Sequence, residues 1–208
     1  FLAYKPPTPW TDSERVLIHS LWLGNLPPLP EDLSNSAAND PRAATLGHSL
    51  FFDTRLSVNG AVSCATCHQP EKRFSDGLEK ARALGQSRRN TPSIVGLAYS
   101  PWLYWDGRRD SLWSQALSPL EDPNEQGSNR MHIVRLVSED VFYNNLYREI
   151  FGSVPDFSDR SRFPEAAGPD LQTGWNNAWE RMTVVDRELV NTTFANVGKA
   201  IAAYERIL

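Results

Sequence analysis

Three features are missing from this sequence, and each absence narrows the class of protein. No run of about 18 apolar residues occurs, so the 208-residue chain contains no candidate transmembrane helix. The net charge is −4 and the 21 basic residues are scattered, which argues against binding to nucleic acid. No segment alternates apolar and polar residues for long enough to predict a strand. The pattern that remains is typical of a mainly α-helical protein with much irregular chain.

The two cysteines of the chain stand in one motif, Cys64-Ala-Thr-Cys67-His68. At this spacing two thiols can form thioethers to one haem, and the histidine can bind its iron as an axial ligand. Cysteines three positions apart can also form a redox disulfide, or supply two of the four ligands of a structural zinc ion. The expected βαβ setting of such a disulfide is missing, and zinc would need a distant fourth ligand. The motif therefore favours one covalent haem c.

Apolar residues recur at helical spacing in five parts of the chain. A first short helix is predicted to begin at Thr11 or Asp12. The other helices are predicted over 42–53, 110–118, 130–151 and 186–208. Glycine and proline predict loops over 69–101 and 119–129, and a polar, proline-containing stretch covers 152–173. We interpret residues 1–208 as a single domain that begins with an extended N-terminal segment, 1–40.

Several segments together resemble the amino-terminal haem domain of bacterial di-haem cytochrome c peroxidases, in the superfamily that includes MauG. The matching segments are 46–57, 64–68, 74–77, 89–93, 104–108, 119–125 and 194–206. The resemblance implies a cytochrome c-like haem domain, mainly α, with long irregular loops around a buried haem. It also implies an oxidoreductase of the peroxidase type.

The resemblance assigns roles to individual residues. Cys64 and Cys67 would hold the haem covalently, and His68 would be the proximal ligand of its iron. Glu125 falls on the family's catalytic glutamate, which moves a proton during peroxide cleavage, and Gln115 falls on a distal glutamine. By their residue types alone, Glu125 would be a solvated loop charge and Gln115 a helix-surface residue.

Two further positions match family residues outside the haem pocket. Trp105 matches a tryptophan between the two haems, where an indole can relay electrons. Asn90 matches a calcium ligand, and its side-chain oxygen suits that hard cation. The family completes this calcium site with carbonyl groups of a second domain and with water.

The chain departs from the family pattern in two ways. Many of these peroxidases carry a histidine after the haem motif that blocks the distal face of the haem, but residues 69–114 contain none. We therefore expect a haem open on its distal side, with His132 reaching the iron as the minority alternative. The second C-x-x-C-H motif of the family is also missing. We expect a second haem domain outside this chain, and the apolar helix that reaches Leu208 favours continuation.

These observations predict a domain that reduces hydrogen peroxide with electrons from a donor protein, delivered through the second haem. One alternative is a MauG-like enzyme that oxidises side chains of a partner protein. The other is a plain electron-transfer cytochrome, for which Met131 or Met182 would have to serve as the second axial ligand. Because haem c is attached outside the bacterial cytoplasmic membrane, we expect an exported, periplasmic protein whose leader has been removed.

Overall fold

A computed structural model describes residues 9–169 and 174–208. Residues 1–8, expected to be extended, and residues 170–173, at the end of the polar stretch, lie outside the described residues. Contacts divide the chain into two compact units, Phe1–Glu31 and Asp32–Leu208. Among the described residues, none of the helices is both long and apolar enough to cross a membrane.

The first unit contains helix α1 (Asp12–Ser20) and the 3-10 turn η1 (Leu23–Asn25). Thr11 caps α1 as the sequence predicts: its hydroxyl accepts a hydrogen bond from the backbone N–H of Glu14, and the Glu14 carboxylate accepts one from the backbone N–H of Thr11. None of the residues of α1 is buried.

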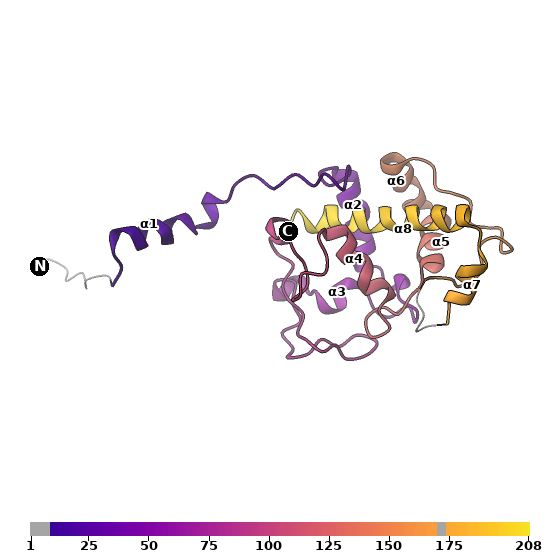
Figure 1. The fold of residues 1–208 in the computed structure, drawn as a ribbon, viewed down its shortest axis with the longest axis horizontal. Coiled ribbons are helices and arrows are strands. Elements are labelled where there is room, and N and C mark those ends of the chain that lie inside the picture. Colours follow the sequence, from indigo (N-terminus) through magenta and orange to yellow (C-terminus); the bar gives the residue numbers. More distant parts are fainter. Residues whose placement is uncertain (1–8, 170–173) are drawn as a thin grey trace, which may run out of the picture. The chain divides into compact units, whose positions relative to one another are not determined.

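The second unit is helical, as expected, and in its described residues the only strand-like pairings are three isolated bridges. Its helical elements follow in the order α2 (Pro41–Phe52), η2 (Thr54–Leu56), α3 (Cys64–Cys67), η3 (Pro70–Lys72), η4 (Leu97–Tyr99), α4 (Leu112–Glu121), α5 (Arg130–Glu139), α6 (Val141–Phe151), α7 (Asn176–Arg181) and α8 (Val184–Glu205). Figure 1 shows α8 running along the second unit beside α2 and α4.

Helix α8 packs closely against α2 and α4 because glycines allow the backbones to approach each other. A Cβ atom at Gly47 of α2 would collide with the backbone of α8 at Ala200. A Cβ atom at Gly198 of α8 would meet the carbonyl oxygen of Trp113 in α4. Glycine thus allows close approach of α2, α4 and α8.

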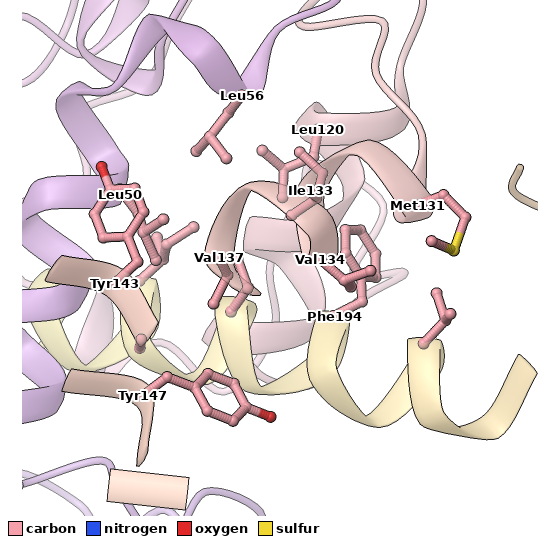
Figure 2. Packing of buried hydrophobic residues seen from close by; sticks show 14 of the residues in the cluster. Leu50, Leu56, Leu120, Met131, Ile133, Val134, Val137, Tyr143, Tyr147 and Phe194 are labelled. Atoms are coloured by element: carbon pink, nitrogen blue, oxygen red, sulfur yellow. The ribbon is translucent and has the colours of Figure 1, made fainter. Parts of the chain in front are cut away.

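The hydrophobic core lies between α8 and the helices α2, α4, α5 and α6 (Figure 2). Ile133, Val134 and Val137 of α5 are fully buried, and Figure 2 shows Val134 beside Phe194 of α8. Tyr143 adds a ring to this core, and its hydroxyl donates a hydrogen bond to Asp53. Burial of such apolar side chains is the dominant favourable contribution to folding.

The structure changes two of the predicted helix boundaries. The pattern at 130–151 is divided into α5 and α6 at Asp140, whose carboxylate accepts hydrogen bonds from the first backbone N–H groups of α6. Helix α4 continues through Pro119 to Glu121, beyond the predicted end at 118, because Leu120 is fully buried in the core. Proline in the last turn removes one backbone donor but does not end this helix.

Candidate haem site

A pocket with an empty volume of about 480 Å³, open solvent included, lies beside α3. Its walls come from α2, α3, α4, the loop that follows α4, and the C-terminal end of α8. The lining residues are Phe51, Val62, Ser63, Cys64, Cys67, His68, Ala83, Gln115, Ala116, Pro119, Glu125, Gln126, Ile201 and Glu205. Five residues assigned from sequence, namely Cys64, Cys67, His68, Gln115 and Glu125, are therefore brought together.

The single-turn helix α3 presents both cysteines to this pocket as free thiols. Its start is fixed by Thr66, whose hydroxyl oxygen accepts a hydrogen bond from the backbone N–H of Ser63 at 3.0 Å. Burial raises the pKa of Cys64 to about 12 and also raises that of Cys67. Both sulfurs are therefore neutral thiols at neutral pH, rather than thiolates of a redox-active pair.

His68 is held by a strained turn that follows α3. Its Nδ1 lies 3.0 Å from the carbonyl oxygen of Phe74, so Nδ1–H is the donor and Nε2 carries the lone pair. Arg73 and Phe74 both have φ of 57°, a left-handed conformation that costs free energy for residues with side chains. Burial lowers the pKa of His68. A neutral imidazole with a free Nε2 lone pair is the form that binds iron.

A second layer of hydrogen bonds supports the turn after α3. The Thr91 hydroxyl donates to the buried Asp76 carboxylate at 2.9 Å, and the Ser75 hydroxyl donates to the Thr91 carbonyl oxygen at 2.9 Å. The Ser93 hydroxyl donates to the carbonyl oxygen of Arg73 at 2.6 Å. The segments 74–77 and 89–93, which carried part of the resemblance, thus orient the histidine.

Gln115 and Glu125 enter the pocket from α4 and from the loop that follows it. This loop is closed by backbone hydrogen bonds from Gln126 to Pro119 and from Gly127 to Asp122. Burial, and then the nearby charge of Asp122, raise the pKa of Glu125 to about 7, while Arg108 acts in the opposite direction. The carboxyl can therefore both hold and release a proton near neutral pH.

Gln126 and Glu205 also line the pocket, and the sequence assigned a role to neither. Gln126 follows Glu125, and its side-chain N–H donates to the Cys64 sulfur at 3.5 Å. Glu205 lies four residues after Ile201 on α8, so the two share a helix face. A signal for Glu205 was present in the sequence, because it is an acidic residue on the otherwise apolar stripe of the last helix.

Three other predicted residues lie outside the lining of the pocket. Trp105 is 73% exposed, and the Arg89 guanidinium lies 5.6 Å from its ring centre. Asn90 is also exposed. His132 Nε2 lies 2.7 Å from the carbonyl oxygen of Arg55, with which it shares a hydrogen bond.

The donor set of the pocket fits a covalently held haem. Two neutral thiols and a neutral histidine line one pocket together with apolar side chains, and two buried polar atoms in its walls, Oε1 of Gln126 and Oε2 of Glu205, have no hydrogen-bond partner. The two thiols are not joined in a disulfide. No cluster of three or more metal-binding side chains is found in the part of the chain that the structure describes, so that part offers no zinc site.

The chain belongs to the di-haem cytochrome c peroxidase family, a family of oxidoreductases, because the model of that family matches residues 41–208. It is 41% identical over 128 residues to the methylamine utilization protein MauG of Methylorubrum extorquens, which covers 60% of this chain and 36% of the relative. It is 35% identical over 193 residues to the MauG protein of Methylophilus methylotrophus, covering 86% of this chain and 56% of the relative.

The fold matches as well. The crystal structure of a MauG-like protein associated with microbial copper homeostasis gives a TM-score of 0.60 at 26% identity, over 89% of this chain and 46% of that one. The cytochrome c-like helical fold predicted from the sequence is thereby confirmed. The chain spans between about a third and just over half of the length of these relatives.

Proposed function

We propose that this chain carries the peroxide-reactive haem of a di-haem peroxidase. Cys64 and Cys67 bind the haem c covalently, and His68 binds its iron on the proximal side. The observation that carries the proposal is that Glu125 and Gln115 line the same pocket as these three residues. A carboxyl near the iron can move a proton between the two peroxide oxygens, and an amide can hydrogen-bond to peroxide.

The overall reaction takes two electrons and two protons to convert one hydrogen peroxide into two waters. Held by Cys64, Cys67 and His68, the haem would supply the redox-active iron for this chemistry. Glu125 accepts a proton from one peroxide oxygen and returns it to the other, while Gln115 orients the molecule by hydrogen bonding. A pKa near 7 suits this exchange, because neither protonation state of Glu125 is strongly favoured.

The distal side is proposed to be open in the resting protein. His68 is the only histidine among the lining residues, and residues 69–114 contain no histidine that could block the iron. Met131 and Met182 are buried in the hydrophobic core and do not line the pocket. This arrangement supports a catalytic haem over a plain electron carrier, which needs a second strong ligand.

Electrons are proposed to arrive from a donor protein through a second haem domain, with Trp105 as the relay. The exposed indole is available for contact with such a domain. Asn90 would contribute to a calcium site with groups of the same second domain. Since haem c is attached outside the cytoplasmic membrane of bacteria, we place the protein in the periplasm.

A MauG-like role is the second candidate, in which the oxidising equivalents act on side chains of a partner protein. The missing blocking histidine and the similarity to two proteins named MauG favour it. The two roles share the chemistry at Glu125 and differ in the source of the electrons. Turnover of peroxide with a small redox donor supports the first role. Turnover only with a protein substrate supports the second.

The spin state of the oxidised haem in the isolated holoprotein tests the shared proposal. We expect a high-spin signal and rapid spectral change on adding peroxide. A purely low-spin, six-coordinate haem that does not react with peroxide would overturn the catalytic proposal.

A further inference from the structure

Glu205 is a buried carboxyl in the wall of the candidate haem pocket that the proposed peroxide chemistry leaves without a role. It is the last residue of α8 and only 5% exposed. Its Oε2 atom has no hydrogen-bond partner among the residues that the structure describes. A buried acidic oxygen without a donor is costly in the charged form, so native proteins keep such a group only where something stabilises it.

Several titratable groups surround Glu205, but none of the described residues that line the pocket is a lysine or an arginine. Elements packed around the end of α8 contribute His48 from α2, the haem-binding residues Cys64, Cys67 and His68 from α3, and Glu125 from the loop after α4. On α8 itself the titratable neighbours are Tyr204 and Arg206, and Arg206 donates a hydrogen bond to Asn39. Within the described residues, the lining contains no lysine or arginine.

Without the positive charge of a ferric haem, burial alone raises the pKa of Glu205 to about 8, so the carboxyl is then mostly neutral at pH 7. As a neutral acid it has an O–H to donate. Gln126 offers an acceptor in the same pocket, because its Oε1 atom is also buried without a partner while its amide nitrogen bonds to the Cys64 sulfur. An acid and an acceptor in one pocket wall can keep a proton close to the haem.

We propose that Glu205 is a redox-linked proton site: its carboxylate takes up one proton from solvent when the haem of this pocket accepts one electron, and it releases that proton on reoxidation. This inference depends on the haem c of the proposed function. The electron comes from the redox donor of that function, and one positive charge enters the pocket for each negative charge, so the net charge of the site is conserved.

The coupling has an electrostatic cause. A ferric haem carries one more positive charge than a ferrous haem, and in a buried pocket that charge stabilises the Glu205 carboxylate. Reduction removes this stabilisation, so the proton affinity of Glu205 rises. Because the reduced form binds the proton more tightly, the reduction potential of the haem must fall as the pH rises through the range in which Glu205 titrates.

The test is the reduction potential of the covalently loaded holoprotein, measured spectroscopically over a range of pH. Glu125 titrates in the same pocket, so the measurement is made in the Glu125→Gln background. We expect a potential that falls with pH in Glu125→Gln, with a slope of up to about 59 mV per pH unit for full coupling of one proton to one electron. In the Glu125→Gln/Glu205→Gln variant the slope should be reduced at pH values below about 8, where the oxidised and reduced forms differ in the protonation of Glu205.

Glu188→Gln in the same background is the matched control, because Glu188 is an exposed residue of the same helix. It should leave the slope unchanged. Equal slopes with and without Glu205 would overturn the proposal. Other titrating groups, the haem propionates included, affect all of these variants alike and cancel in the comparison.

A second measurement covers the case in which the Glu205 variant does not retain haem. Infrared difference spectra of Glu125→Gln, recorded on reduction, should show a gain of protonated carboxyl signal, and no gain would overturn the proposal. Failure here differs from failure of the proposed function. A haem that cleaves peroxide but has a pH-independent potential would refute only the role of Glu205, whereas an inert haem would leave the potential measurement valid.

Discussion

Two regions of the second unit contain carboxyl groups that are at least partly buried, and the pKa values of these groups are shifted in opposite directions. Where α2 meets α6, Asp53 receives hydrogen bonds from Arg55 and from the Tyr143 hydroxyl. Burial would raise the pKa of Asp53, but these bonds hold it below its usual range. In the pocket, burial raises the pKa of Glu125 and Glu205 to about 7 and 8.

The two regions differ in the hydrogen-bond donors that are available to their carboxyl groups. The Arg55 guanidinium also bonds to Asp140, so this charged cluster, Asp53–Arg55–Tyr143–Asp140, ties α2 to α6. Its carboxylates are ionised and structural. Within residues 9–169 and 174–208, the two pocket carboxyls form no ion pair of this kind, and they can change protonation near neutral pH. Paired acids stabilise the fold, and unpaired acids in a pocket are typical of a functional site.

The largest expected effect follows from removing the pocket acid assigned to peroxide. Glu125→Gln should slow peroxide cleavage by about 10²- to 10⁴-fold, because general acid–base catalysis contributes about that much. Stopped-flow spectra of the holoprotein would measure the rate, and haem content should be unchanged. Glu188→Gln is the control and should react at the wild-type rate. An unchanged rate in Glu125→Gln would remove Glu125 from its role.

Breaking the paired cluster should instead affect stability. Arg55→Met leaves the partly buried Asp53 carboxylate with only the Tyr143 hydroxyl and the backbone N–H of residue 55 as donors. We expect the free energy of unfolding at pH 7 to fall by about 1 to 3 kcal/mol, the usual cost of an uncompensated buried group, at the lower end because Arg55 is partly exposed. Urea denaturation measures this.

The stability loss expected for Arg55→Met should depend on pH, and the lowered pKa of Asp53 sets the direction of that dependence. A carboxyl with a lowered pKa contributes stability above its unfolded pKa, and the contribution is lost as the pH falls through its folded pKa. The difference between wild type and Arg55→Met should therefore shrink in acid, and Asp53→Asn/Arg55→Met should recover part of it at pH 7. A difference that stays constant down to acid pH would contradict the electrostatic explanation.

Neutralising the unpaired acid of α8 should act in the opposite direction. Because the folded pKa of Glu205 lies above its ordinary value of 4.5, the wild type loses stability as the pH rises from about 4.5 to about 8. Glu205→Gln removes this loss. We expect its unfolding free energy at pH 8 to exceed that of the wild type by on the order of 1–2 kcal/mol, with little difference at pH 4. Lower stability of the variant at pH 8 would show that the carboxylate is paired.

The sequence predicts the helices and the residues of the haem motif better than it predicts the contacts and burial of individual acidic residues. Helices α2 and α8 are foreseen because their apolar residues recur at helical spacing, and the haem motif directs attention to His68. Five site residues meet in one pocket as the resemblance implies. The roles assigned to these five residues stay predictions, as do those of Trp105 and Asn90, which are exposed and would act with a second domain.

Other features depend on contacts that no local pattern reveals. Asp140 divides one apolar stretch into α5 and α6, because its side chain caps the second helix. Glu205 stands on the apolar stripe of the last helix, but the burial of its carboxyl in a pocket wall is visible only after α8 has packed against α2 and α4. The described lining of the pocket contains no lysine or arginine. Because this lining comes from five separate segments, its composition is visible only after they fold together.

The smallest expected effect tests which force sets the pKa of Glu125. If the ionised carboxylate accepts the peroxide proton, the rate should fall about tenfold for each pH unit below an apparent pKa near 7.

Burial is the main cause of that pKa and the charge of Asp122 is the second, while Arg108 lowers the pKa. Asp122→Asn keeps the side-chain oxygen that accepts from the Asn124 backbone and removes only the charge. It should move the midpoint of the pH–rate profile down by less than about one unit, and Arg108→Gln should move it up by a similar amount. Opposite shifts of this size would show that burial, and not the neighbouring charges, prepares the acid for its role. A midpoint that returns to the ordinary range of a glutamate in Asp122→Asn would instead make charge repulsion the main cause of the raised pKa. The pocket would then differ from the charged cluster around Asp53 in its neighbouring charges, rather than in burial without a donor.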